Sequence, residues 1–491
     1  MQEKFWELVK LPSRYWNIPF FAGFASIISQ IILIREFLFI FYGNELSIGI
    51  FLAVWLMWSG LGSYAVNFIK SDRFFSPFII RLLLMLLPIT AFITLLLLKN
   101  SLYFLEVNSG QYPSIFNTAI FVLAAMLPIG LITGMLFTSI IRFMKNKDNH
   151  RTSNLVYVFE SIGSMAGGLL FILLLNKYVG SLFVLVLLLS LSVMIPVNKQ
   201  RKKRLSLLTP LLVAFLVFSP VEDIERHLTI SQWKQINSEL KFEKEIKTDY
   251  QTLSIMELAG ERTLYSDGKP AYSIPDIYNS EKFVHTVFSQ AKNAKNVLLI
   301  GSSASGLQAE ILKYGSNIDC VEPDRALFEF TSYLLTESEK EAIKQGRINF
   351  INRDGREYVN SCAKSYDVIL LNTGGPATMN KNRFYTLEFF DKVKKILNKD
   401  GIFAFSMQSA EDFLGDDLKN FNASIFNAFS HIFDKYVLVT GDKLILIGST
   451  AELTGYNIKS IMSGFTDRKI STEYFSPYMF PQIFREERAE N

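Results

Sequence analysis

The sequence has few residues of the kinds that build disulfide frameworks or metal sites. It contains two cysteines, Cys320 and Cys362, and four histidines among 491 residues. Both cysteines lie in contexts typical of a buried core, and the histidines lack metal-ligand spacing, so neither a disulfide framework nor a metal site is predicted. The net charge is only +4, with the basic residues mainly in short loops between apolar runs. Nucleic-acid binding therefore gains no support.

A second absence concerns one loop. In Tyr366–Thr386, YDVILLNTGGPATMNKNRFYT, an apolar segment typical of a buried strand leads into a loop without any Asp or Glu after Asp367. Enzymes with parallel sheets often carry catalytic carboxylates in loops at this edge of the sheet. The sequence therefore raises the question of whether the chemistry has moved elsewhere or been lost.

Apolar residues, in contrast, are abundant: they make up 49% of the chain and are concentrated before about residue 221. A helix of roughly 20 residues crosses a bilayer. Apolar runs of about that length occur at Ile18–Tyr42, Leu46–Ile69, Pro77–Leu98, Ile115–Phe143, Leu155–Leu175 and Val179–Val197. A seventh run, Leu205–Val221, contains Pro210 and either spans the membrane or lies in its interface. Residues 1–221 are thus predicted to form an α-helical multi-pass membrane bundle of six or seven helices.

Basic residues mark the cytoplasmic side of a membrane protein. Here they precede the first run and follow the second, fourth and sixth: Lys4, Lys10, Arg14, Lys70, Arg73, Arg142, Lys145, Lys147, Arg151, Lys199 and Arg201–Arg204. We therefore expect a protein of the cell inner (plasma) membrane, in contact with the lipid bilayer, with a cytoplasmic N-terminus. The soluble domain lies outside if the seventh run spans, and in the cytoplasm if it does not.

Several ionisable residues fall inside or at the ends of these runs. Because charge is costly within a bilayer, such residues are functional candidates: Arg35, Glu36, Glu45 and Glu160. The alternative is that Arg35 pairs with a glutamate and only locks the bundle. Glycines four residues apart are interpreted as helix-packing positions: Gly130 with Gly134, and Gly163 with Gly167.

The rest of the chain has the pattern of a soluble α/β protein. Residues 222–245 are predicted to be a linker, 246–290 a small β element, and 291–491 a Rossmann-like domain. The apolar strand Val297–Ile300 runs into a loop of small residues, Gly301–Gly306, and then a helix, and the next strand ends before Glu322. Such a loop lets backbone approach a ligand, and an acid after the second strand can accept bonds from ribose hydroxyls.

A third strand, Ile348–Ile351, precedes Asp354 and Gly355. An acid at this place in a nucleoside-binding sheet can accept a bond from an adenine amino group. Asp354 is equally suited to be the N-cap of the following helix.

Taken together, these segments resemble the spermidine synthases, which are polyamine aminopropyltransferases, and the whole chain resembles their membrane-fused relatives. The segments that carry the resemblance are DYQTLSIMELAGERTLYSDGKPAYS, VLLIGSSASG, CVEPD, RDGREYV, NRFYTLEFFDKVKKIL and, in the membrane half, LIREFLFIFYGNELSIGIFLAVWLMWSGLGS and YVFESIGSMAGG. The resemblance implies a Rossmann-like domain of methyltransferase type, preceded by a small β-hairpin element.

The family transfers an aminopropyl group from decarboxylated S-adenosylmethionine to a diamine and releases methylthioadenosine. Carried over by resemblance, the residues that bind this S-adenosylmethionine-type nucleoside are Gln251, Gly301, Gly306, Glu322, Asp354 and Gly355. The candidates for binding a diamine or polyamine substrate are Asp267, Glu281, His285 and Asn372. No metal is expected.

The departures from the family concern its carboxylates. The nucleoside loop reads GSSASG, with Ala304 or Ser305 where the family has an aspartate, and the two aspartates after the fourth strand are replaced by Asn372 and Gly375. An amide is not a useful general base near neutral pH. The catalytic residues are therefore unknown.

Three hypotheses follow. The first is a membrane-bound transferase whose activity is altered or lost, in the latter case a pseudoenzyme. The second is a non-enzymatic binding, assembly or sensory module on a membrane bundle, as a homo-oligomer or with a membrane-complex partner. The third is a transporter of a small polar solute with a regulatory soluble domain.

Overall fold

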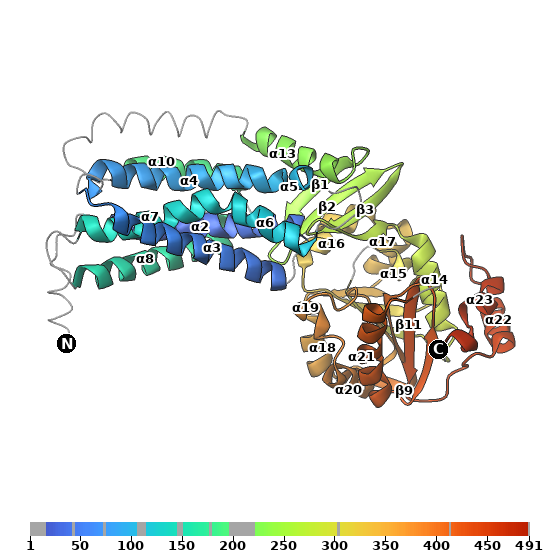
Figure 1. Cartoon of the computed structure of the whole chain (residues 1–491). Helices are drawn as coiled ribbons and strands as arrows, with labels where there is room; N and C mark the ends of the chain where they lie inside the picture. Colours follow the sequence, from blue (N-terminus) through green and yellow to red (C-terminus); the bar gives the residue numbers. More distant parts are fainter. Residues whose placement is uncertain are drawn as a thin grey trace. The chain divides into compact units, whose positions relative to one another are not determined.

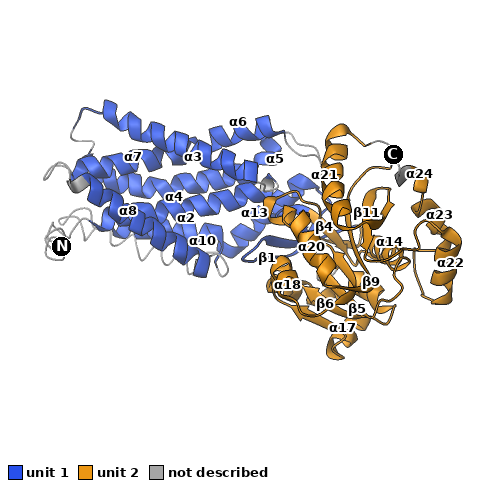
Figure 2. Ribbon diagram, turned by 90° about the horizontal axis from the view of Figure 1, so that it is seen from below, with its two compact units in different colours: residues 1–258, 265–269 blue, residues 259–264, 270–491 orange. Residues whose placement is uncertain are grey.

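The computed structural model describes residues 16–41, 45–71, 75–105, 114–144, 151–175, 179–195, 221–301, 305–411 and 414–489. The chain divides into two compact units (Figure 2). Unit 1 comprises residues 1–258 and 265–269, and unit 2 comprises residues 259–264 and 270–491.

Unit 1 contains a bundle of apolar helices (Figure 1). Their bounds are α2 (Asn17–Ile40), α3 (Glu45–Ala65), α4 (Pro77–Lys99), α5 (Ser101–Phe104), α6 (Ile115–Ala125), α7 (Leu127–Met144), α8 (Arg151–Leu170) and α10 (Ser181–Met194), with a π-helical turn, η4 (Phe171–Leu175). Within the described residues, 5 helices are long and apolar enough to cross a membrane, judged by length and composition: α2, α3, α4, α7 and α8.

Two of the predicted runs differ from the observed helices. The run Ile115–Phe143 forms two helices, because α6 ends at Ala125 and α7 begins at Leu127. Pro128 is the second residue of α7, where its missing N–H leaves no helix bond unmade. The sixth run, Val179–Val197, yields α10 of only 14 residues. The seventh run lies outside the described residues except for Val221, which begins helix α13 (Val221–Ile236).

The predicted packing glycines lie where helix backbones meet. A Cβ placed on Gly134 of α7 would be 1.9 Å from the carbonyl oxygen of Ser59 in α3, and one on Gly163 of α8 would be 1.9 Å from that of Phe20 in α2. No side chain fits at such distances. The glycines therefore allow α7 to pack on α3 and α8 to pack on α2, as predicted.

The region 222–245 is not the linker that we expected. It forms most of helix α13 and leads into strand β1 (Lys241–Lys247), which pairs antiparallel with β2 (Thr252–Leu258). Strands β3 (Glu261–Ser266) and β4 (Lys269–Ile274) complete a sheet in the order β1-β2-β3-β4. Asp267 and Gly268 have positive φ angles of 47° and 76° at the turn before β4, which is the geometry an Asp-Gly hairpin turn requires.

Unit 2 is built on a sheet in the order β10-β11-β9-β8-β5-β6-β7. Strands β5 (Asn296–Ile300), β6 (Asn317–Val321), β7 (Ile348–Ile351), β8 (Tyr366–Leu371) and β9 (Leu397–Gln408) are parallel. At one edge, β11 (Lys443–Ser449) is antiparallel to both of its neighbours, β9 and β10 (Lys435–Val439). The Rossmann-like fold predicted for this region is confirmed.

Both faces of this sheet are covered, which explains the continuous apolar run of β5. Val297 and Leu299 belong to one core, with α14 (Ile277–Phe288) and α15 (Leu307–Leu312); Leu298 and Ile300 belong to the other, with α20 (Leu387–Lys395) and α21 (Asp416–Ile432). The remaining helices are α16 (Arg325–Thr331), α17 (Glu337–Lys344), α18 (Gly355–Ser361), α19 (Met379–Asn382), α22 (Ile458–Asp467), α23 (Phe480–Ile483) and α24 (Glu486–Ala489).

Candidate functional site

The strand order of unit 2 reverses between β5 and β8. The chain runs outward from β5 through β6 to β7 and then returns to β8 on the other side of β5. Ligands of open α/β sheets bind at the carboxyl edge of such a switch point. At this edge β5 ends before Gly301 and β8 ends before Asn372, whose backbone N–H donates to the carbonyl of Ile300 at 2.8 Å.

Position 301 requires glycine, both for its backbone conformation and because neighbouring atoms leave no room for a side chain. Its φ is +83°, and a Cβ on it would lie 2.9 Å from the carbonyl oxygen of Asn372 and 3.0 Å from Thr373 Cγ2. Gly306 also has a positive φ, +91°, at the N-cap of α15. Residues 302–304 lie outside the described part of the chain, so the predicted position of Ala304 is not described.

Glu322 lies directly after β6, at the same edge. Its backbone N–H donates to the carbonyl of Ile351 at 3.1 Å, and its Oε1 accepts a bond from the N–H of Asp324 at 3.1 Å. The side chain is half-buried. Glu322 and Gly301 thus follow neighbouring strands, β6 and β5, at the same edge of the sheet.

Asp354 is the N-cap of α18. Its Oδ1 accepts bonds from the N–H groups of Arg356 and Glu357 at 3.1 and 3.0 Å, and its Oδ2 is paired with the guanidinium of Arg383. Asp354 therefore serves as the N-cap, and an adenine amino group would have to share this carboxylate. Gly355 is tightly enclosed, since a Cβ on it would be 2.5 Å from Ile300 Cγ2.

The loop after β8 is held by a residue that we did not predict. Tyr385 is buried, and its hydroxyl donates to the carbonyl of Gly374, which has a φ of +76°. Burial raises the pKa of Tyr385 to about 12, so the hydroxyl keeps its proton at neutral pH. The sequence identifies the NRFYT segment only through its resemblance to the family. No pattern along the chain predicts that Tyr385 bonds to a carbonyl eleven residues earlier.

This loop carries cations but no carboxylate. The ammonium of Lys381 would be 3.3 Å from a Cβ placed on Gly374, whereas a Cβ on Gly375 would have nothing within 4 Å. No hydrogen bond of the half-buried Asn372 side chain to another described residue is present. The two residues that replace the expected aspartates thus lie at this edge with room around Gly375.

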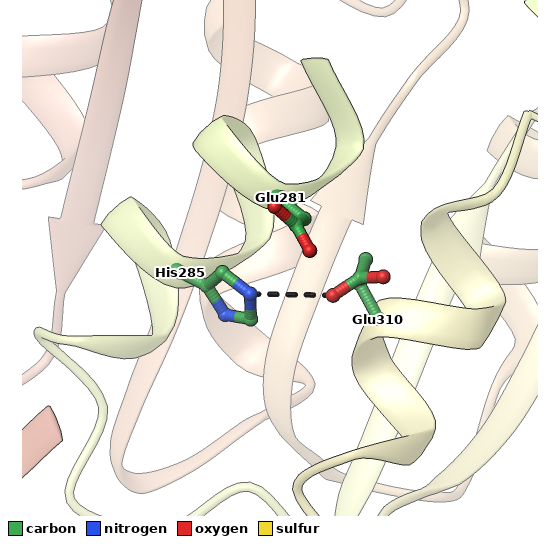
Figure 3. Close-up of side chains that lie close together, drawn as sticks. All are labelled: Glu281, His285 and Glu310. Carbon is green, nitrogen blue, oxygen red and sulfur yellow. Dashed lines mark ion pairs between the residues drawn. The ribbon is translucent and has the colours of Figure 1, made fainter. Parts of the chain in front are cut away.

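Glu281 and His285, two of the predicted substrate-binding residues, are instead fully buried on α14, where they lie near Glu310 of α15 (Figure 3). The Glu281 carboxylate accepts bonds from the backbone N–H groups of Glu473, Tyr474 and Phe475 at 2.7, 2.8 and 2.8 Å. His285 Nε2 lies 3.2 Å from Glu310 Oε2, and its Nδ1 is 2.9 Å from the hydroxyl of Tyr314.

The ligand atoms of Glu281, His285 and Glu310 all lie within 4.8 Å of one another, a spacing that a metal ion could use. The Lys313 ammonium already lies among them, 2.7 Å from Glu310 and 3.5 Å from Glu281. A cation is therefore present without a metal, and we interpret the cluster as the ionic core that fixes residues 473–475 to α14.

The predicted residues Gln251 and Asp267 belong to unit 1. Asp267 Oδ1 accepts a bond from the N–H of Thr252 at 2.8 Å, and the side-chain oxygen of Gln251 accepts a bond from the hydroxyl of Ser266. Both side chains thus shape the small sheet. Glu322 and Asp354, in contrast, belong to unit 2.

Of the four polar candidates in the bundle, Arg35 and Glu36 line one cavity, while Glu45 is exposed and Glu160 accepts a long 3.5 Å bond from Ser164. Glu36 is paired with Lys99 at 2.9 Å rather than with Arg35. The sequence carried one signal for this partner: Lys99 is the basic residue directly after the apolar run that ends at Leu98.

A parallel sheet with a glycine after its first strand and an acid after its second is typical of Rossmann-like, nucleoside-binding domains. Comparison with known proteins narrows this class. Residues 276–441 match the spermine/spermidine synthase domain family. This part of the chain is therefore spermidine synthase-like.

Individual relatives differ in how much of the chain they cover. Polyamine aminopropyltransferase 2 of Aquifex aeolicus is 24% identical over 462 residues, which is 90% of this chain and 88% of that protein. The enzyme of the same name from Hyperthermus butylicus is 34% identical over 163 residues, 31% of this chain and 52% of its own length. The crystal structure of a spermidine synthase in complex with the transition state analogue AdoDATO covers 50% of this chain and 84% of its own, at 20% identity and a TM-score of 0.42.

Proposed function

We propose that this protein is a membrane-anchored, spermidine synthase-like protein that binds an adenosine-type nucleoside at the carboxyl edge of the large sheet, and that its aminopropyl transfer is altered or lost. The nucleoside is decarboxylated S-adenosylmethionine or its product, methylthioadenosine. A diamine or polyamine is the expected second ligand.

The observation that carries the proposal is the composition of the switch-point edge. Gly301 gives close backbone access there and Glu322 supplies a carboxylate after β6, which are the two elements a ribose site needs. The neighbouring loop after β8 is held by the Tyr385–Gly374 bond, so its shape does not depend on acidic residues.

The chemistry of aminopropyl transfer explains why the activity is expected to change. An amine attacks the carbon next to the sulfonium only when it is deprotonated, and a carboxylate is the usual acceptor of that proton in this family. Between Val368 and Leu387 the sequence has no Asp or Glu, and it has Lys381 and Arg383.

The membrane part of the proposal rests on the five apolar helices of unit 1. We place the protein in the inner (plasma) membrane with its N-terminus in the cytoplasm, because the basic residues flank the apolar runs on one side. The side that holds the synthase-like domain depends on residues 205–221.

A second candidate is ordinary aminopropyl transfer with a rearranged site. The similarity to the Aquifex aeolicus polyamine aminopropyltransferase favours it, because it extends over 90% of this chain, including the apolar helices. In that case another group would have to accept the proton.

The test is isothermal titration of the full-length protein in detergent with methylthioadenosine, followed by an assay of methylthioadenosine release from decarboxylated S-adenosylmethionine and putrescine. We expect binding without release. Glu322→Ala should abolish binding, and Glu329→Ala, an exposed glutamate on α16, is the matched control. Absence of nucleoside binding by the unaltered protein refutes the proposal, and release that requires Glu322 favours the second candidate.

The location of the synthase-like domain is tested separately. A cysteine introduced at Lys269 in a variant lacking Cys320 and Cys362 is probed with an impermeant thiol reagent on intact cells. Labelling places this domain outside, and labelling only after lysis places it in the cytoplasm.

A further inference from the structure

Unit 1 contains a cavity of about 40 Å³ that the proposed nucleoside site does not involve. Side chains from α2, α4, α13 and β1 reach it, and the charged ones are Arg35, Glu36, Lys99, Glu225, Glu245 and Lys247. A buried water needs roughly 10–15 Å³, so the space is enough for about three waters or for a small polar group with a short apolar stem.

Two ion pairs in the wall are complete. Glu36 is paired with Lys99 at 2.9 Å, and the Gln232 amide bonds to both of them at 3.0 Å. Glu225 is 3.5 Å from Lys247 and also accepts the N–H of Ser181, in the first turn of α10, at 2.9 Å. These four charges hold elements together and compensate one another.

The two remaining charges differ in their surroundings. Arg35 lies within electrostatic range of the acids Asp267, Glu36 and Asp249. Glu245 accepts one hydrogen bond, from the Ser254 hydroxyl at 2.8 Å, and no Lys or Arg nitrogen of the described chain lies within 4 Å of its carboxylate. Glu245 is therefore the one lining carboxylate without an ion-pair partner among the described residues.

We propose that this cavity binds the primary ammonium group of a small organic cation, with the Glu245 carboxylate as its counter-charge. Apolar side chains of Ile32, Phe39 and Phe171 line the same cavity and suit the methylene carbons next to such a group. Apolar walls offer no ligands to a metal cation. An anion would be repelled by the acids around Arg35.

The environment of Glu245 supports a site that responds to a cation. Burial raises the pKa of Glu245, and Lys247 of its own strand, Lys99 of α4 and the Ser254 hydroxyl only partly oppose this, while Glu36 of α2 adds to it. A buried carboxylate that has no ion-pair partner is stabilised more by a cation that binds next to it than a carboxylate that is already paired.

The test is isothermal titration of butylamine into the full-length protein in detergent, with butan-1-ol as the neutral probe of the same shape. We expect saturable butylamine binding and no butanol binding. Glu245→Gln keeps the size of the side chain and its bond to Ser254 but removes the charge, so it should weaken butylamine binding about tenfold or more. Glu243→Gln, an exposed residue of the same strand, is the matched control and should change nothing.

A second variant and a second condition keep the test decisive. Glu245→Asp retains the charge and should bind butylamine more tightly than Glu245→Gln. Lowering the pH from 8 to 5 should weaken binding more in the unaltered protein than in Glu245→Gln, because protonation removes the same charge. Equal butylamine affinity in the unaltered protein and in Glu245→Gln overturns the proposal.

The inference is independent of the proposed nucleoside site. Methylthioadenosine binding, which depends on Glu322, should be the same in Glu245→Gln as in the unaltered protein. Loss of nucleoside binding alone therefore counts against the proposed function, and loss of Glu245-dependent amine binding alone counts against this cavity.

Discussion

Replacement of Glu281 by Gln should release the C-terminal segment of unit 2. The buried carboxylate of Glu281, 1% exposed, accepts three backbone N–H bonds: Oε1 from Glu473, and Oε2 from Tyr474 and Phe475. A glutamine keeps one acceptor oxygen, and its NH₂ group cannot accept. With the oxygen facing Tyr474 and Phe475, the N–H of Glu473 loses its partner.

The expected magnitude follows from these bonds. An unsatisfied buried donor costs about 1–3 kcal/mol, and two bonds to a charged acceptor become neutral bonds, each weaker by about 1 kcal/mol. Removing the charge relieves part of its desolvation penalty. A net loss of roughly 3 kcal/mol remains, which is a large share of the 5–15 kcal/mol that stabilises a typical domain.

Hydrogen exchange of the backbone amides at 473–475 is the appropriate measurement, because unfolding of a protein with two units is not expected to be a single transition. A loss of roughly 3 kcal/mol speeds exchange about a hundredfold. Glu337→Gln, which removes an exposed ion pair with Lys340, should leave these amides unchanged. Exchange within threefold of the unaltered protein in Glu281→Gln would refute this account of the cluster.

Three further predictions concern unit 2. Gly355→Ala should destabilise unit 2 by about 1–3 kcal/mol, because the added methyl group overpacks against Ile300. The control Gly464→Ala has nothing near its Cβ and should be neutral or slightly stabilising. Hydrogen exchange of the β5 amides compares the stability of the two variants. Burial raises the pKa of Glu281, but the three backbone N–H bonds and Lys313 outweigh burial and leave the pKa lowered. The stability that this group contributes should therefore be complete above the unfolded pKa of about 4.3 and be lost as the pH falls below it toward the folded value; amide exchange at 473–475 in Glu281→Gln should lack that pH dependence. Asn372→Asp combined with Gly375→Asp should raise methylthioadenosine release above that of either single variant, and no gain would mean that more than the proton acceptor is missing.

The parts of the fold that depend on local pattern could be predicted. Strand β5 and the start of α15 after Gly306 could be predicted because an apolar run followed by small residues is a signal within one short segment. The packing glycines in α7 and α8 were found from their spacing of four residues. The break between α6 and α7 was missed because apolar residues continue through it and Pro128 is compatible with a helix start.

The contacts that define the candidate sites could not be predicted from local sequence patterns. Glu36 and Lys99 are paired across 63 positions, and Glu281 reaches N–H groups 192 to 194 positions away. A single sequence lists the charged residues but does not say which of them meet, because loop closure brings distant segments together without a local signature. The resemblance alone predicts Glu281 and His285 as substrate-binding residues, whereas the structure places them in an internal ionic cluster.

In the loop after β8, the residues that fix the conformation are not the residues at the positions of the expected aspartates. Its conformation is fixed by the hydrogen bond that the Tyr385 hydroxyl donates to the Gly374 carbonyl. The turn that follows is fixed by the ion pair between Arg383 and the Asp354 carboxylate. Neither bond involves Asn372 or Gly375, and Gly375 has open space where a side chain would lie. The bonds that hold this loop therefore do not depend on a carboxylate at position 372 or 375, so the shape of the loop is compatible with Asn372 and Gly375 as well as with aspartates at these positions.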